Sequence, residues 1–458
     1  MTSPANTRLP ISDDVEAVLP AAISRAHNWL KSTADEEDKA TEQLADLLRD
    51  EDGVKFTMDF VDRVMRPEDD KVAAHALKDI SSHYDPSFLG SINGALVGAG
   101  GFFGPILPNL VMPITRIYMR KMVGHLVLDA ESESLNKTLD KAAESGEQLN
   151  LNLLGEAVLG EAEAKSRAER TLKLIQNPRV TYVSVKASSM VAQLNQWDID
   201  GSVERLKERL RPLYEEAARR NPQVFINMDM EEYHDLHLTI RLFKELMSEP
   251  EFKNLESGIV LQAYLPDTFD ALKDIAEFAK KRVAEGGAKV KVRIVKGANL
   301  SMETVQGEVH DWPLATYTNK LDVDANYYRL LDFILREEYA DSVRIGVATH
   351  NLYTAAMAYE LGKKRGVLHM MDSEMLQGMS PAQQAAVRKV FDGRQILYTP
   401  VVHAEDFDVA VSYLVRRLEE NSAPQNFLYA LFAPGEEPLA DQEETFRRAV
   451  AKRWDTFA

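Results

Sequence analysis

The second half of the sequence alternates short β-branched runs with longer amphipathic stretches, and this alternation limits the possible folds more than any other feature. Eight strand-like runs lie at 151–157, 180–188, 224–230, 258–265, 290–298, 343–351, 367–376 and 396–402. Stretches with helical spacing of apolar residues follow them at 162–175, 201–220, 232–248, 268–284, 324–339, 353–364, 381–390 and 406–420. Eight consecutive strand–helix units predict an α/β fold, a (β/α)8 TIM-type barrel, because an open doubly wound sheet usually has fewer strands.

Residues before the barrel have a different character. Residues 12–85 carry apolar residues at helical spacing, including a run at Glu36–Asp50, and show no strand-like run. We therefore predict a helical N-terminal arm and helical domain over 1–145, the barrel over 146–433, and a linker or tail over 434–458. The Glu-rich tail is expected to lead to a further module in a longer protein.

Pro86–Thr115 contains no charged residue and is long enough to span a bilayer. Its four prolines and six glycines interrupt helical hydrogen bonding and would leave backbone groups unpaired in lipid. We expect a packed or partner-facing apolar segment, and contact with a membrane surface stays open.

Composition removes several classes of function. The chain has 54 Lys+Arg against 72 Asp+Glu and a net charge of −18, so nucleic acid is a poor candidate partner. The absence of cysteine excludes disulfides, thiolate metal sites and thiol nucleophiles. The pair His234 and His237 has no third ligand in register, so no metal site is predicted. The first residues lack a secretory signal pattern, and a cytoplasmic location is expected.

Polar residues recur at the carboxyl ends of the predicted strands, which is the face where barrels of this type carry their active sites. In chain order they are Glu156, Lys186, Asp229, Gln262, Arg293 with Lys296, His350 with Asn351, Gln377 and Tyr398. On the last helix a second group shares one stripe at i, i+3, i+4 and i+7, namely Tyr413, Arg416, Arg417 and Glu420. Adjacent arginines at a barrel mouth need anions, and a guanidinium matches a carboxylate bidentately. The pattern predicts a site for a small carboxylate substrate.

Two other functions remain open from these residues alone. Lys186 and Lys296 end strands, as the Schiff-base lysine of an aldolase on this fold does. Alternatively, the barrel is a non-catalytic binding module that uses the apolar segment as a docking surface.

Several motifs together resemble the proline dehydrogenase family. They are LLGEA, SVKAS, NMDMEE, LQAY, VRIVKGA (292–298), ATHN (348–351), LQGM (376–379) and YLVRRLEEN (413–421). The order of the motifs is similar to that in the proline dehydrogenase half of bacterial bifunctional proline utilization A. This resemblance implies a barrel that binds FAD non-covalently and oxidises L-proline to 1-pyrroline-5-carboxylate by hydride transfer to flavin N5. It also implies a quinone electron acceptor, possible peripheral contact with the inner face of the cell membrane, and fusion to an aldehyde dehydrogenase domain.

The resemblance implies roles for the substrate residues. Arg416, Arg417 and Lys186 would bind the proline carboxylate, and Glu156 would pair with one of the arginines and gate the site. Asp229 would order Lys186. Tyr398 and Tyr413 would form the aromatic walls of the pocket, with Leu376 on its apolar side. The residues leave the proton acceptor for the proline amine open between Asp229, Tyr398 and water.

For the flavin, the resemblance places Arg293 beside N5 and Gln262 against the isoalloxazine. Lys296, Gly297, Thr349, His350 and Asn351 would contact the dinucleotide, and Glu420 the ribose. Most members of the family carry tyrosine where this sequence has Asn299, so one contact on the flavin side is expected to differ.

Overall fold

The computed structural model describes residues 13–33, 51–65, 67, 69–84, 100–123, 127–130, 133–155, 160–195, 197–392, 394–403, 410, 413, 417, 420–421, 423–433 and 435–455. The predicted helix at Glu36–Asp50, the first part of the apolar segment, and the site candidates Glu156 and Arg416 lie outside these residues.

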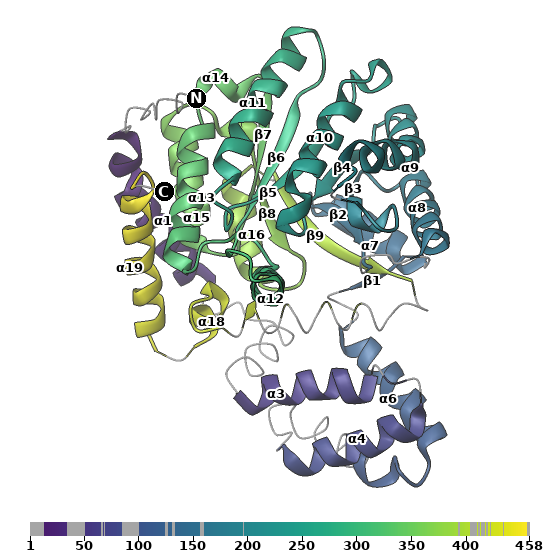
Figure 1. The fold of residues 1–458 in the computed structure, drawn as a ribbon. Coiled ribbons are helices and arrows are strands. Elements are labelled where there is room, and N and C mark those ends of the chain that lie inside the picture. Colours follow the sequence, from purple (N-terminus) through teal and green to yellow (C-terminus); the bar gives the residue numbers. More distant parts are fainter. Residues whose placement is uncertain are drawn as a thin grey trace.

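Eight parallel strands form a closed barrel, which confirms the predicted (β/α)8 fold (Figure 1). Each strand pairs with the next along the chain, and β9 also pairs with β2, so the barrel has no free edge. A short strand, β1 (Leu128–Asp129), pairs with the carboxyl end of β9. The barrel strands are β2 (Gln148–Leu153), β3 (Tyr182–Lys186), β4 (Phe225–Asp229), β5 (Ser257–Gln262), β6 (Val290–Val295), β7 (Val343–Ala348), β8 (Met371–Leu376) and β9 (Gln395–Val402).

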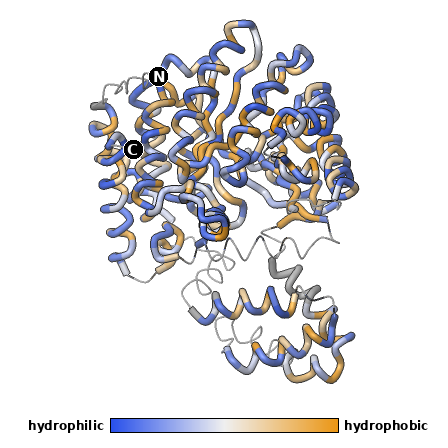
Figure 2. Tube along the Cα trace, viewed as in Figure 1, coloured by the Kyte–Doolittle hydropathy of each residue, from blue (hydrophilic) through white to orange (hydrophobic). Residues whose placement is uncertain are grey.

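Helices cover the outside of the barrel, and apolar residues gather between helices and strands (Figure 2). Side chains alternate between the two faces of a strand, so Val183 and Val185 of β3 are buried on the face opposite to Ser184 and Lys186. The covering helices are α8 (Glu161–Gln176), α9 (Ile199–Arg219), α10 (Leu236–Met247), α11 (Thr268–Ala284), α13 (Lys320–Ile334), α14 (Glu337–Ala340), α15 (Leu352–Lys364) and α16 (Pro381–Val390). Short helical turns are η3 (Ala187–Ser189), η4 (Tyr233–Asp235), η5 (Pro250–Phe252) and η6 (Leu368–Met370).

An additional helix, α12 (Leu300–His310), follows β6 and was not predicted. It lacks a regular apolar stripe, and Val305 and Val309 are exposed on it. One buried acid fixes this helix, because Glu303 accepts a hydrogen bond from the backbone N–H of Tyr233 at 2.7 Å.

Both ends of the described chain pack on the barrel. Helix α1 (Asp13–Thr33) lies along α15 and α16, and Arg25 donates to Glu360 at 2.6 Å. Helix α18 (Phe427–Phe432) ends just before the region 434–458, which the sequence suggested was a linker or tail, and α19 (Glu437–Lys452) occupies much of that region. That region is fastened to α13, since Arg453 and Trp454 both donate to the buried carboxylate of Asp332.

The N-terminal helical region is built from α3 (Glu51–Phe60), η1 (Val61–Met65), α4 (Asp70–His83), α6 (Pro108–Val123) and α7 (Glu133–Glu144). Phe56, Phe60 and Leu77 share a small apolar core with Leu154 and Val402, which follow β2 and end β9. This contact places the region at the carboxyl end of the barrel. Within the described part of the chain, the length and apolar character needed to cross a membrane are not met by any helix.

Candidate active site

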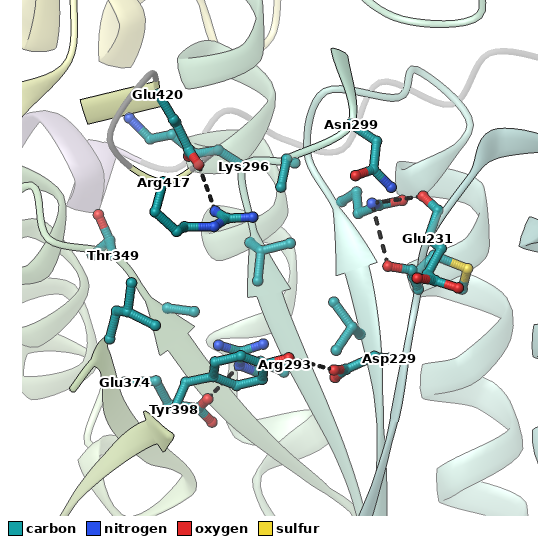
Figure 3. A pocket seen from close by; sticks show the side chains of 18 of the residues that line it. Asp229, Glu231, Arg293, Lys296, Asn299, Thr349, Glu374, Tyr398, Arg417 and Glu420 are labelled. Carbon is teal, nitrogen blue, oxygen red and sulfur yellow. Dashed lines mark hydrogen bonds and ion pairs between the residues drawn. The ribbon is translucent and has the colours of Figure 1, made fainter. Parts of the chain in front are cut away.

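A cavity of about 760 Å³ opens at the carboxyl ends of the barrel strands (Figure 3). Its volume falls within the range usual for small-molecule and cofactor sites. Every barrel strand contributes to the wall, through Asn152, Lys186, Asp229, Gln262, Arg293, Ala348, Leu376 and Tyr398. Most polar strand ends named from the sequence thus line one cavity, whereas Gln377 is not among its lining residues and Glu156 lies outside the described residues.

Arg417 and Lys186 are two of the cations that line this cavity, and Arg417 lies in its upper part in Figure 3. Arg417 forms an ion pair with Glu420 at 2.5 Å, and its guanidinium lies 5.3 Å from the centre of the Tyr413 ring. Lys186, at the end of β3, forms an ion pair with Glu231 at 2.8 Å, and Ser188 donates to the other oxygen of that carboxylate. Each cation is held by an acidic residue and still faces the cavity.

Asp229 and Tyr398 form a hydrogen-bonded pair in the cavity wall, below Arg417 in Figure 3. The Tyr398 hydroxyl donates to Asp229 Oδ2 at 2.9 Å, while Asn227 and Ser184 donate to Oδ1 at 2.8 and 3.1 Å. Burial raises the pKa of the Asp229 carboxyl, although Arg293 and Lys186 act in the opposite direction. Burial also raises the pKa of Tyr398 well above its ordinary value. Tyr398 therefore keeps its proton at neutral pH, which leaves Asp229 and water as candidate proton acceptors.

Arg293 on β6 lies in the floor of the cavity. Its Nε forms an ion pair with Glu374 of β8 at 2.5 Å, and its guanidinium lies 4.7 Å from the centre of the Tyr398 ring. Both partners restrict the rotamers of Arg293, so its charge has a fixed position below Arg417 (Figure 3).

A second cationic group combines Lys296, which was expected at the dinucleotide, with Lys320, which was not predicted. Lys296 and Lys320 both pair with the buried carboxylate of Asp324, at 2.5 and 2.6 Å. Gly297 has φ +124°, and a Cβ there would lie 2.5 Å from the Tyr264 ring, so only glycine fits. Nearby, the Gln262 amide donates to the backbone oxygen of Glu231 at 3.0 Å.

The loop after β7 carries Thr349, His350 and Asn351, which all line the cavity. Asn351 caps α15 by accepting from the N–H groups of Tyr353 and Thr354. His350 Nε2 accepts from the backbone N–H of Leu376 at 2.9 Å, so Nδ1 carries the proton and faces Ser380 Oγ at 3.1 Å. Burial lowers the pKa of His350 to about 4. These two side chains hold the loop, in addition to any contact with a ligand.

A flavin dinucleotide would fit the residues present. Gln262 Oε1 is buried at the cavity wall without a hydrogen-bond partner, which suits a donor on a polar ring. Gly155, also in the wall, has no room for a side chain, because a Cβ would overlap Arg167. Lys296 and Lys320 would offer positive charge to phosphate groups.

Three features of the site were missed from the sequence. The expected partner of Lys186 was Asp229, but the observed one is Glu231, two residues further on, whose place after the strand end was a usable signal. Glu374 was readable as an acid at an inward position of a buried strand. The wall residues Asn426, Phe427 and Leu428 belong to α18 and carry no motif.

Comparison with known proteins places the chain in a family. The family model described as proline dehydrogenase matches residues 135–430, more than half of the chain and all eight barrel strands. The chain belongs to the proline dehydrogenase family. The bifunctional protein PutA of Klebsiella aerogenes is 28% identical over 374 residues, which cover 77% of this chain and 27% of that protein.

Proline dehydrogenase of Deinococcus radiodurans is 26% identical over 266 residues, which cover 55% of this chain and 77% of that protein. The solved structure of Proline Utilization A (PutA) from Corynebacterium freiburgense has 60% identity and a TM-score of 0.68, and the match covers 74% of this chain and 33% of that one. These similarities confirm the resemblance to the proline dehydrogenase half of proline utilization A. The chain spans only 27% of the length of the Klebsiella relative.

Proposed function

We propose that this chain oxidises L-proline to 1-pyrroline-5-carboxylate with FAD as the bound oxidant. The observation that carries the proposal is the arrangement of charge across one cavity. Arg417 and Lys186 both line it, and Arg293 and Tyr398 line it below Arg417 in Figure 3. The cavity thus has a cationic end for a carboxylate and a second cation beside the space for an aromatic ring system.

In this proposal the substrate carboxylate binds Arg417 and Lys186, with Arg416 as a further ligand. Charge-assisted hydrogen bonds to both cations would fix the orientation of the imino acid. Tyr398 and Tyr413 would hold the ring between aromatic faces, with Leu376 on the apolar side. Glu156 would pair with an arginine and gate the site.

When bound, FAD would accept a hydride at N5 from the carbon next to the proline nitrogen. The chain would contribute Arg293 near that position and Gln262 as a partner of the ring. Other contacts would come from Lys296, Gly297, Thr349, His350, Asn351 and Glu420. The proline amine loses a proton in the same oxidation, so two electrons and one proton leave with the hydride and one proton leaves to a base or to water.

The proposal extends to the partners of the reaction. Electrons would leave the reduced flavin for a quinone, which requires approach to the inner face of a cell membrane from the cytoplasm. In a longer protein, an aldehyde dehydrogenase domain would take the product further.

Schiff-base chemistry fits the structure less well. Lys186 and Lys296 are ion-paired at 2.8 and 2.5 Å. Each of these nitrogens is engaged by a carboxylate, whereas a Schiff-base lysine must approach the carbonyl carbon of its substrate directly.

An anaerobic titration with proline, followed at the flavin absorption band, tests the proposal. We expect the purified protein to be yellow and to bleach on addition of L-proline, with 1-pyrroline-5-carboxylate as product. A colourless protein that is trapped on lysine by borohydride in the presence of a carbonyl substrate would instead establish the aldolase alternative.

A further inference from the structure

A chain of alternating charges runs through the interior of the barrel and ends at the cavity. Arg293 pairs with Glu374 at 2.5 Å, and Glu374 pairs through its other oxygen with Lys291 at 2.6 Å. Lys291 also contacts Asp372 at 3.1 Å. We call these residues, with Arg344 and Glu256 beyond them, the buried charge chain. Arg344 pairs with Asp372 at 2.6 Å and with Glu256 at 2.7 Å.

The position of the buried charge chain follows from the alternation of side chains along each strand. Lys291 and Arg293 are two residues apart on β6, and Asp372 and Glu374 are two apart on β8, so each pair points into the barrel. Between them on β7 stands Gly346, where a Cβ would overlap the Glu374 carboxylate. Because Gly346 has no side chain, there is space for Glu374 and Lys291 to contact each other.

Burying charged side chains costs free energy, so their presence inside the barrel needs an explanation. The side chains of Lys291 and Glu374 are both 0% exposed. Desolvating an ion pair can cost as much as its attraction returns, and apolar residues of similar volume are often at least as stable. Stability alone thus gives little reason for charges here. They reach the cavity through Glu374, which lines it, and through Arg293, whose Nε Glu374 holds.

We propose that Glu374 and Lys291 are positioning residues that set how much positive charge Arg293 presents to the bound cofactor. Glu374 aims the guanidinium and offsets its charge, and Lys291 in turn offsets Glu374. This inference rests on the proposed function, because the cofactor concerned is the flavin. By this proposal, residues in the floor of the barrel adjust the reduction potential of the flavin.

The proposal predicts shifts of opposite sign for two substitutions. Glu374→Gln keeps an oxygen that can accept from Arg293 but removes a negative charge beneath the cavity. The reduced flavin carries more negative charge than the oxidised form, so it is favoured, and the potential rises. Lys291→Met removes a positive charge and leaves Glu374 to Arg293 alone, so the potential falls. A role in packing alone gives no reason for opposite signs.

The test measures the flavin reduction potential of wild type, both variants and a control, by equilibration with reference dyes. We expect each variant to shift the oxidised-to-reduced equilibrium by about tenfold or more, about 30 mV for two electrons. The matched control is Glu256→Gln, the same substitution at the far, partly exposed end of the buried charge chain, and it should leave the potential unchanged.

Each outcome decides the question. Shifts of opposite sign, with an unchanged control, support the proposal. A wild-type flavin that proline bleaches, with potentials unchanged or shifted in the same direction in the variants, overturns this inference and leaves the proposed function standing. Wild-type protein without flavin overturns both. If Glu374→Gln fails to fold, a downward shift in Lys291→Met still supports the inference, and an unshifted potential there overturns it.

Discussion

Replacing Arg417 by methionine removes one cation from the proposed carboxylate site while keeping an unbranched side chain of similar reach. In the structure Arg417 faces the cavity and is held by Glu420 at 2.5 Å and by the Tyr413 ring at 5.3 Å. Methionine could not bind the substrate carboxylate, and it would leave Glu420 without its cation. We therefore expect substrate binding to weaken, with little effect on the fold because Glu420 is exposed.

The magnitude follows from the number of contacts. A hydrogen bond to a charged group contributes about 1.5–3 kcal/mol, and about 1.4 kcal/mol corresponds to tenfold. Loss of one such contact predicts a rise of about 10- to 150-fold in the Michaelis constant for proline. The assay is proline-dependent reduction of an artificial electron acceptor, with proline varied and flavin content measured for each sample.

Arg447→Met is the matched control, because Arg447 forms a similar helix-surface ion pair with Glu443 at 2.6 Å on α19. It should leave the constant within about twofold of wild type. A Michaelis constant in Arg417→Met equal to that of the control, at equal flavin content, would refute the assignment of Arg417 to the carboxylate.

Three further predictions concern stability, cofactor binding and pH. Asp332 is 1% exposed and accepts from arginine and tryptophan donors, so Asp332→Ala should lower the unfolding free energy by about 3–5 kcal/mol, seen as a lower urea midpoint. Burial alone would raise the pKa of Asp332, but these donors lower it below the ordinary value of 3.8. The destabilisation caused by Asp332→Ala should therefore become smaller as the pH falls through the lowered pKa of Asp332. Gly297→Ala should reduce flavin occupancy by about tenfold or more. The control is Gly286→Ala, where φ is also positive, at +79°, but the nearest atom to an added Cβ is 3.7 Å away, and its flavin occupancy should not fall. Equal flavin occupancy in the two variants would contradict the steric argument. Burial lowers the pKa of His350 to about 4, so unfolding takes up a proton at this residue between pH 6.5 and 4. As the pH falls over that interval, wild type should lose more stability than His350→Asn; parallel profiles would count against this assignment.

The barrel could be predicted from the sequence because its signal is distributed over many residues. Eight separate runs had to agree in length and order, so an error at one boundary, such as β8 beginning at Met371 rather than at 367, did not alter the fold. Helix α12 was not predicted, and neither was the packing of α19 on the barrel, since that region was interpreted as a weakly helical linker or tail. The positions of both depend on long-range contacts, such as Glu303 to Tyr233 for α12 and Arg453 and Trp454 to Asp332 for the end of α19, and a periodic pattern contains no such information.

The candidate site was predictable to the level of which side chains meet, but not of which pairs they form. The strand-end rule brings Lys186 and Arg293 to one face whatever their partners are. Their observed partners, Glu231 and Glu374, depend on side-chain rotamers and on the space left at Gly346, which no spacing rule describes.

The docking of α19 sets the shortest fragment of this chain that is worth expressing. The match to the family ends at residue 430, which suggests a C-terminal boundary for a shortened chain at that residue. Such trimming would remove Phe446, whose ring lies 5.5 Å from those of both Tyr328 and Tyr353, and would strip Asp332 of two donors. Tyr328 and Tyr353 would then be exposed, and this aromatic surface would favour aggregation. A shortened chain that stays in solution should therefore extend to residue 455.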